Sequence, residues 1–510
     1  MLWTLRFLTF CLIVLVTASF AMGQDGLRKI DFSVVEKKTS KPVPCRIHLK
    51  DKAGKPQRAG TLPYWYDHFV CPGTAQLELP PGDYTYEVER GPEYAMATGT
   101  FTVTDKDQMK IHVELERLLD LTKEGWWSGD LHVHRPVADI ELLMRAEDVH
   151  LAPVITWWNN RNEWAEKPLP ENPLVRFDHD RYYQVMAGED EREGGALLYF
   201  NLCQPLAITG SSREYPSPMK FVADAHRHKN VWIDVEKPFW WDVPVWLASG
   251  EVNSIGLANN HMCRDKQYEN EAWGKPRDAK RLPPPLGNGF WTQEVYYHVL
   301  NCGLRIPPSA GTASGVLPNP LGYNRVYVQL GDDFTWDKWW DGLRAGRAFV
   351  TNGPLLRVLV NGQHPGHVFG GPNGKEIELD VKVSLTSRNH VRFLEIIKNG
   401  RVERKVPYED LAKTGTLGRI SFQESGWFLV RVITDNPKTF RFASTGPYYV
   451  EVGDVKQHIS RLSAQFFLDW VQERTGRIKL NKEDQRKEVL KHHADAKRFW
   501  EEILARATAD

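Results

Sequence analysis

The spacing of apolar residues changes three times along the chain, and this restricts the fold more than any other feature of the sequence. Residues 24–117 carry short apolar runs separated by turns, which is typical of a β-sandwich. Between 118 and 354, strand-like runs alternate with helix-like runs, a pattern that favours a parallel α/β architecture, either an open sheet or a barrel. Residues 355–453 return to strand-like runs, and residues 454–510 have helical spacing.

These changes define the expected domains. Residues 24–117 resemble the transthyretin-like or carboxypeptidase-regulatory-like modules of secreted enzymes. We expect an α/β region at 118–354, a second β-sandwich at 355–453 and a helical tail at 454–510. The second sandwich is predicted in part from Asn399-Gly400, which follows an apolar run and is a strong hairpin signal.

Residues 1–23 are expected to form a secretory signal peptide. Arg6 supplies a positive charge, and the apolar run at 7–16 is too short to span a bilayer. Small residues follow this run, so we predict cleavage after Ala21 or Gly23. The alternative is a retained N-terminal anchor. Because the chain has no other long apolar stretch, we expect a secreted or periplasmic protein without stable membrane insertion.

The balance of charge argues against one class of partner. The chain has 65 Lys and Arg and 65 Asp and Glu, a net charge of 0, which does not suit a general nucleic-acid-binding protein. We therefore expect a small-molecule or glycan substrate, and the oligomeric state stays open. Beyond the signal peptide, Cys45 and Cys71 share one segment and could pair, whereas the other cysteines are expected to be buried apolar residues.

The stretch from Ser128 to Pro136 carries the strongest chemical signal. Side chains alternate along a strand, so Asp130, His132 and His134 point to one face. Two imidazoles about 7 Å apart along a strand can bind one metal ion, and Asp130 could orient a histidine or bind the ion directly. The alternative is a pair of histidines on a polar surface. The position at the start of the α/β region favours a metal site.

Polar residues also follow three other strand-like runs of the same region. They are Glu189-Asp190-Glu191 after one run, Asp234, Glu236 and Lys237 after another, and Asn259-Asn260-His261 after a third. The carboxyl ends of parallel strands meet at one edge of a sheet, so we expect these side chains to line one bowl.

The residues Gly129-Asp130-Leu131-His132-Val133-His134, followed by Asp139 and Gly188-Glu189, resemble the PHP (polymerase and histidinol phosphatase) superfamily. The branch that they resemble is the secreted, carbaryl-hydrolase-like metal-dependent hydrolases. The resemblance implies a distorted (β/α)7 barrel over 118–354, flanked by the two β-sandwiches. It also implies a divalent metal bound by the paired histidines and a later glutamate, with metal-activated water attacking a phosphoester, carbamate or ester.

The sequence departs from the family pattern at several positions. The family has Thr-Asp-His-Asn where this chain has Thr156-Trp157-Trp158-Asn159, and it has His-Pro where this chain has Lys237-Pro238. It has Gly-His where this chain has Gly194-Gly195. It has Ser-Asp-x-His where this chain has Gly311-Thr312-Ala313-Ser314-Gly315. We therefore expect a reduced site with one divalent metal, Zn or Mn, bound by His132, His134, Glu189 and His261. Glu236 or Asp190 is the expected general base, and Lys237 is expected to stabilise a developing oxyanion or to protonate a leaving group.

Tryptophan is unusually frequent, with 19 residues in the chain. Fourteen of them lie between Trp126 and Trp340, many in adjacent pairs, and they serve either as core residues or as a platform for sugars and aromatic ligands. Arg305 and Arg325 lie in Gly- and Pro-rich loops and could bind an anionic group. The predicted substrate-binding residues are Arg135, Trp158, Asn159, Trp240, Asn260, Arg305 and Arg325.

Three functions agree with these patterns. The first is an exported metal-dependent hydrolase acting on an ester, phosphoester, carbamate or glycan-linked substrate. The second is a metal-independent glycan-active enzyme that uses Glu189 and Glu236, whose carboxyls would then lie about 5–10 Å apart. The third is a non-catalytic glycan- or ligand-binding pseudoenzyme. We favour the first because the strand with two histidines and its preceding Gly-Asp are present.

Overall fold

The computed structural model describes residues 26–104 and 109–510. The predicted signal peptide at 1–23 lies outside these residues. Among the helices that are described, none combines the length and the apolar character needed to cross a bilayer.

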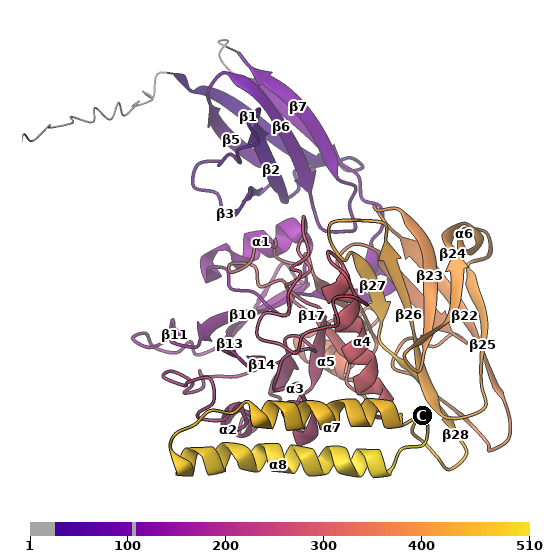
Figure 1. The fold of residues 1–510 in the computed structure, drawn as a ribbon. Helices are drawn as coiled ribbons and strands as arrows, with labels where there is room; N and C mark the ends of the chain where they lie inside the picture. Colours follow the sequence, from indigo (N-terminus) through magenta and orange to yellow (C-terminus); the bar gives the residue numbers. More distant parts are fainter. Residues whose placement is uncertain (1–25, 105–108) are drawn as a thin grey trace, which may run out of the picture.

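Two sheets form the N-terminal region, at the top of Figure 1. Its strands are β1 (Arg28–Glu36), β2 (Cys45–Asp51), β3 (Tyr64–Trp65), β4 (His68–Cys71), β5 (Thr74–Leu79), β6 (Gly82–Glu89), β7 (Ala97–Val103) and β8 (Met109–Leu115). One sheet has the order β5-β1-β8 and the other β3-β4-β2-β6-β7. Alternate residues of β1 and β2, such as Phe32 and Ile47, are buried in a shared core between the sheets.

The outer face of the five-stranded sheet is also buried. In the pairing of β2 with β4, Cys45 lies opposite Cys71, with the two Sγ atoms 3.7 Å apart, on the core side. The alternate residues of these strands point away from that core, and helix α1 (Ile140–Glu147) packs against them. Val70 of β4 is 2% exposed and joins the hydrophobic cluster of α1. The two regions therefore pack against each other through α1, which lies below the N-terminal strands in Figure 1.

The central region contains short strands and helices. The described elements are 3-10 helices at Leu121–Glu124 and Val137–Asp139, β9 (Trp126–Gly129), α1, β10 (Leu151–Trp158), β11 (Arg161–Asn162), β12 (Leu174–Phe177), β13 (Arg181–Arg192), β14 (Gly195–Phe200), α2 (Pro218–Ala225), β15 (Trp232–Val235), α3 (Val243–Ser249), β16 (Ser254–Ala258), α4 (Gly287–Asn301), β17 (Pro308–Ala310), β18 (Arg325–Gln329), α5 (Trp336–Arg344) and β19 (Ala348–Thr351). Tryptophans fill its core, and of the four adjacent pairs only Trp158 is not fully buried.

The prediction of a PHP-like, helix-flanked (β/α)7 barrel is wrong. β10, β13 and the short strands between them follow one another without a helix, and β13 turns directly back as the antiparallel strand β14. β14 also pairs antiparallel with β15. The sheet continues through β18 and β19 into the C-terminal strands. The physical reason is that β13 does not end at Ala187: the acidic stretch 188–192, which has the composition of a loop, continues the strand.

The C-terminal strands form a second pair of sheets, at the right of Figure 1. They are β20 (Leu355–Val360), β21 (Val368–Gly371), β22 (Ile377–Thr386), β23 (Val391–Lys398), β24 (Arg401–Pro407), β25 (Thr416–Phe422), β26 (Gly426–Thr434), β27 (Phe442–Thr445) and β28 (Tyr448–Val452), with α6 (Tyr408–Thr414) between β24 and β25. The sheet β20-β22-β25 packs on the extension of the central sheet around a core of its own.

A helical hairpin closes the chain. Helices α7 (Arg461–Gly476) and α8 (Glu483–Ala505) pack on each other and on α3, below the central region in Figure 1. Arg474 is 2% exposed and pairs with Asp242 and Glu214 of the central region. Because a buried guanidinium without partners would be strongly destabilising, this pairing fixes the tail in one orientation.

Candidate metal centre

The two histidines of the HxH motif lie in an extended segment between β10 and the residues that follow β17. Val133 pairs in parallel with Val154 on one side and with Ser314 on the other. Val133 is fully buried in the core, so His132 and His134 project from the opposite face of the segment. The segment is extended, and His132 and His134 share one face of it, as the alternation of side chains along a strand predicts.

Two glycines allow the chain after β17 to pass close behind these histidines. A Cβ atom on Gly311 would lie 2.4 Å from Cβ of His132. At Gly315, where φ is 102°, a Cβ atom would lie 2.6 Å from the carbonyl oxygen of His134. Only glycine avoids both the strain and the contact, so this loop supports the site without contributing a ligand.

Three donor atoms converge at the site. Nε2 of His132 and Nε2 of His134 are 3.0 Å apart. Oε2 of Glu189, from β13, lies 3.4 Å from the first nitrogen and 3.1 Å from the second. Ligands of one tetrahedral zinc ion are separated by about 3.0–3.5 Å, so the triangle has the size of three of the four positions around such an ion.

Hydrogen bonds alone do not satisfy this triangle. Each imidazole nitrogen carries at most one hydrogen. If both nitrogens donate to Glu189, the two N–H groups face each other across 3.0 Å. If only one nitrogen donates to Glu189, the other nitrogen carries no hydrogen and cannot donate to the carboxylate that it faces. A cation at the centre would satisfy all three contacts at once, so the cluster of His132, His134 and Glu189 is a candidate metal centre.

Burial and charge set the protonation of the three groups. Burial raises the pKa of the Glu189 carboxyl, but the His132 and His134 imidazoles outweigh this effect and hold that pKa well below its usual range. Burial lowers the pKa of His134, so this ring is neutral and its lone pair is available. Burial also acts to lower the pKa of His132, but the carboxylates of Glu189 and Glu236 raise it overall.

Glu236 orients His132. Its Oε1 atom lies 3.4 Å from Nδ1 of His132, the ring nitrogen that does not face Glu189. The carboxylate also accepts hydrogen bonds from Trp240 Nε1 at 3.0 Å, from Asn260 Nδ2 at 2.5 Å and from Lys237 Nζ at 2.5 Å. A carboxylate with this many donors is not free to act as a general base. It is placed to fix the tautomer of His132, as carboxylates behind metal-binding histidines do.

Asp130 supports the site from behind. It is fully buried and accepts hydrogen bonds from the Thr312 hydroxyl at 2.6 Å and from the backbone N–H of Gly322 at 2.7 Å. It also accepts the N–H of His132 at 3.1 Å. Burial raises the pKa of Asp130 in spite of these bonds. The residue therefore joins the loop after β17 to the HxH segment and does not belong to the metal cluster.

Glu191 is expected from the sequence to line the bowl with its neighbours, but the sequence assigns it no role at the site. It lies two positions after Glu189 on the same face of β13, and Trp158 Nε1 donates to it at 3.1 Å. It is half-buried, and burial together with the charges of Glu189 and Glu236 raises its pKa to about 7. A cavity of about 200 Å³ opens beside it. The alternation of a strand would have indicated it, had 188–192 been treated as strand rather than loop.

Two other predicted site residues lie close by but outside the cluster. The Asp190 carboxylate, on the opposite face of β13, pairs with Arg192 through both oxygens, at 2.7 and 2.8 Å. His261 is packed against the rings of Phe239 and Tyr268. Burial and the neighbouring charge of Lys237 hold the pKa of His261 well below its usual range. The structure thus brings together three of the four predicted metal ligands.

The predicted substrate-binding residues divide into near and remote groups. Near the cluster, the Trp158 ring lies 4.9 Å from the His134 ring, centroid to centroid, and Asn159 accepts the N–H of Glu191. Trp240 and Asn260 bind Glu236, as described above. Arg135 is 5% exposed and lies over the Trp65 ring of the N-terminal region.

The other two arginines are remote. Arg305 pairs with Glu451 of the C-terminal sheets at 2.7 Å. Arg325 is 1% exposed and donates to backbone carbonyls, including that of Glu147 at 3.0 Å. In the described part of the chain, neither guanidinium is hydrogen-bonded to a residue of the metal centre.

Comparisons with known proteins do not identify the chain. No protein-family model and no curated protein matches it. A Streptococcal ancillary pilin aligns with 21% of this chain and 37% of its own, at 18% identity and a TM-score of 0.16. The Bacillus anthracis TIE protein aligns with 85% of this chain and 51% of its own, at 8% identity and a TM-score of 0.15. Less than two thirds of either solved chain is covered, and neither TM-score supports a common fold.

Proposed function

We propose that this protein is a metal-dependent hydrolase whose metal is bound by His132, His134 and Glu189. The observation that carries the proposal is the triangle of their donor atoms, with sides of 3.0, 3.1 and 3.4 Å. Two imidazoles and one carboxylate suit zinc, and they leave a fourth position for water or substrate. The likeness of the HxH segment to PHP hydrolases remains a sequence-based prediction that agrees with this function.

The residues around the triangle have separate roles. A divalent metal supplies Lewis acidity and lowers the pKa of bound water. Glu236 keeps Nε2 of His132 turned toward Glu189, and Lys237 neutralises Glu236. Glu191, half-buried on the same face as Glu189, is placed to hold or release a proton at the reacting group. Trp158 keeps Glu191 in position through its Nε1–H.

The substrate is expected to approach from the side of Glu191. The His132 and Glu189 side chains are 4% and 3% exposed, whereas Glu191 and Trp158 are half-buried and border the open surface. This side fits a small ester, phosphoester, carbamate or glycan-linked group.

The test is metal content combined with hydrolysis. The mature protein is treated with a chelator, reloaded with Zn²⁺ or Mn²⁺, and assayed against p-nitrophenyl acetate, p-nitrophenyl phosphate, a naphthyl carbamate and p-nitrophenyl glycosides. We expect hydrolysis of at least one substrate, dependent on reloading, and we expect His134→Ala to lose the metal of this centre together with hydrolysis. The matched control is His112→Ala, an exposed histidine of β8.

Two results would reject the proposal. One is a metal content per chain that is the same in His134→Ala as in the unmodified protein. Metal held at another site would be present in both proteins and would not affect this comparison. The other is glycoside hydrolysis that persists in the chelator, which would favour a metal-independent glycan-active enzyme.

A further inference from the structure

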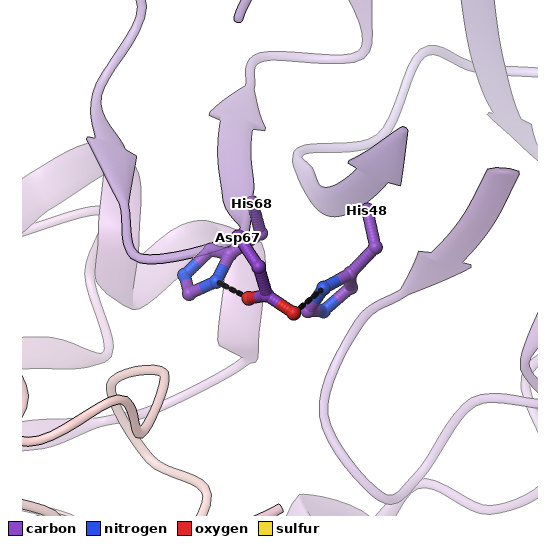
Figure 2. A group of neighbouring side chains, drawn as sticks. All are labelled: His48, Asp67 and His68. Carbon is purple, nitrogen blue, oxygen red and sulfur yellow. Dashed lines mark hydrogen bonds and ion pairs between the residues drawn. The ribbon is translucent and has the colours of Figure 1, made fainter. Parts of the chain in front are cut away.

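A second group of two histidines and a carboxylate lies in the N-terminal region, far from the HxH segment along the chain. Figure 2 shows Asp67 between the rings of His48 and His68. Oδ2 of Asp67 lies 3.1 Å from Nδ1 of His48, and Oδ1 lies 3.1 Å from Nδ1 of His68. The three ligand atoms all lie within 4.8 Å of one another.

The strand pairing explains how these side chains meet. Ile47 of β2 pairs with Phe69 of β4, so His48 and His68 are adjacent in the pairing and project from the outer face of the sheet. Asp67 belongs to the tight turn between β3 and β4, next to His68. The cluster is thus built from two neighbouring strands and one turn, which hold the donors rigidly.

The cluster is buried although it lies on the outer face. His48 is 2% exposed, His68 1% and Asp67 8%. Helix α1 and the loop that contains Arg264 cover this face. Within the described residues, neither ring nitrogen of His48 has a hydrogen bond that meets the usual geometry. Nδ1 of His48 therefore has only the 3.1 Å contact with Asp67, and Nε2 of His48 has no hydrogen-bond partner among the described residues, which is costly for a buried imidazole.

The charges around the cluster are already paired. Arg46 lies 3.2 Å from Glu89 and 2.7 Å from Glu147. Arg264 and Arg388 also pair with Glu89, and Arg264 pairs with Glu87. Arg264 also pairs with Asp265, so the three arginines are matched by four acids, and none of the three is left to neutralise the Asp67 carboxylate. A cation beside Asp67 compensates for its negative charge.

The protonation of the cluster agrees with a metal site. Burial lowers the pKa of His48, and it lowers the pKa of His68 to about 3, so both rings are neutral near pH 7. Burial raises the pKa of Asp67, but the two imidazoles outweigh it and hold that pKa far below its usual range. Neutral imidazoles and an ionised carboxylate are the forms that bind metal.

We propose that His48, Asp67 and His68 bind a second divalent cation, of which zinc suits the donor set best. The ring nitrogens and the carboxylate supply three of four tetrahedral positions, and water that enters beside Asp67 supplies the fourth. All three ligands come from the N-terminal region. The ion stabilises this face of the sheet against the central region and is separate from the proposed hydrolase centre.

The experiment counts metal in a protein whose first site has been removed. The full mature chain carrying His132→Ala is treated with a chelator, incubated with ZnCl₂ alone, desalted and analysed for zinc per chain. The same is done for His132→Ala/Asp67→Asn and, as a matched control, His132→Ala/His112→Ala. Asparagine keeps the shape and one oxygen of Asp67 but not its charge. Thermal unfolding is recorded for each protein with and without zinc.

We expect about one zinc per chain in His132→Ala and in the His112 control, and roughly 100-fold weaker binding in the Asp67→Asn variant. Zinc is expected to raise the unfolding temperature of the first two proteins only. Should Asp67→Asn fail to fold, His68→Asn takes its place, because the asparagine NH2 group can still donate to Asp67 but replaces the imidazole nitrogen with one that does not bind a metal.

Three results overturn the proposal: no zinc in His132→Ala, zinc that is unaffected by Asp67→Asn or His68→Asn, or a zinc-dependent rise in unfolding temperature that survives these substitutions. The unmodified protein separates this inference from the proposed function. One zinc per chain that is lost with Asp67→Asn but kept with His132→Ala would reject the hydrolase centre and support the N-terminal site.

Discussion

The two histidine–carboxylate clusters have the same donor set but different surroundings. The cluster of the central region, His132, His134 and Glu189, lies beside two half-buried residues. Glu191 can donate or accept a proton, and Trp158 supplies an aromatic ring. In the N-terminal region, His48 and its partners lie under α1 and a layer of paired arginines and glutamates. The two proposed sites thus share their donors and differ in access and in neighbouring acids, and this difference is why we propose catalysis for the first and a structural role for the second.

The strongest test of the different roles proposed for the two clusters is to remove one cluster at a time. Loss of a metal-orienting partner alone costs about 10- to 100-fold in activity, so loss of the ligand in His134→Ala is expected to cost more than about 100-fold. Asp67→Asn is expected to leave the rate at 25 °C nearly unchanged and to lower the unfolding temperature. Hydrolysis of the best substrate, measured at saturating zinc, checks both. Equal losses of rate in the two variants would contradict the division.

Stability at the junction between the two regions is expected to depend on pH independently of either metal. Glu93 accepts hydrogen bonds from Tyr327 at 3.0 Å and from the N–H of Leu121 at 2.8 Å. Burial, and then the charge of Asp148, raise the pKa of Glu93 to about 7 from an ordinary value of 4.5. The folded protein therefore keeps a proton that the unfolded chain loses, and stability falls as pH rises from about 4.5 to about 7.

The difference of 2.5 pKa units corresponds to about 3 kcal/mol of unfolding free energy. Glu93→Gln cannot ionise, so its stability relative to the unmodified protein should be about 3 kcal/mol more favourable at pH 8 than at pH 5. Urea unfolding of the metal-free proteins at the two pH values measures this. A relative stability that does not change with pH would show that Glu93 is ionised in the folded state.

A smaller effect should separate orientation from ligation in the central cluster. Glu236→Gln keeps the shape of the carboxylate but weakens its hold on Nδ1 of His132. We expect zinc affinity at this centre to fall by roughly 10- to 100-fold, with no change at the N-terminal cluster. Competition with a zinc-sensitive dye measures both affinities. Unchanged affinity at the central cluster would mean that Glu236 has no part in orienting His132.

The smallest expected effect concerns Glu191. Trp158→Phe removes the Nε1–H that donates to this carboxylate, at a cost of about 1 kcal/mol, or roughly fivefold in kcat/KM. Metal content should not change, which the zinc analysis checks. A loss of zinc in this variant would instead place Trp158 among the residues that hold the metal centre together.

The sequence predicts the local part of the central site and misses the parts that depend on tertiary structure. Alternation along a strand is enough to place His132 and His134 on one face. The same rule applied to 188–192 would have paired Glu189 with Glu191, but the acidic composition of this stretch is that of a loop. That misassignment also contributes to the incorrect barrel, because β13 and β14 form an antiparallel hairpin where a loop leading to the next parallel strand was expected.

The N-terminal cluster shows a different limit of sequence reasoning. Polar residues on the outer face of a β-sandwich normally face water, so His48 and His68 carry no special signal along the chain. Their burial depends on α1 covering the sheet, and α1 lies about seventy residues after β4 in the sequence. Contacts between regions this far apart are not encoded in any local pattern.

The most direct test of the account is the position of bound metal. A crystal of the zinc-loaded protein, measured on both sides of the zinc absorption edge, is expected to show an anomalous peak about 2.0–2.2 Å from Nε2 of His132, Nε2 of His134 and a carboxylate oxygen of Glu189. A zinc-loaded crystal with no peak among these three atoms would contradict the assignment of this cluster as a metal centre.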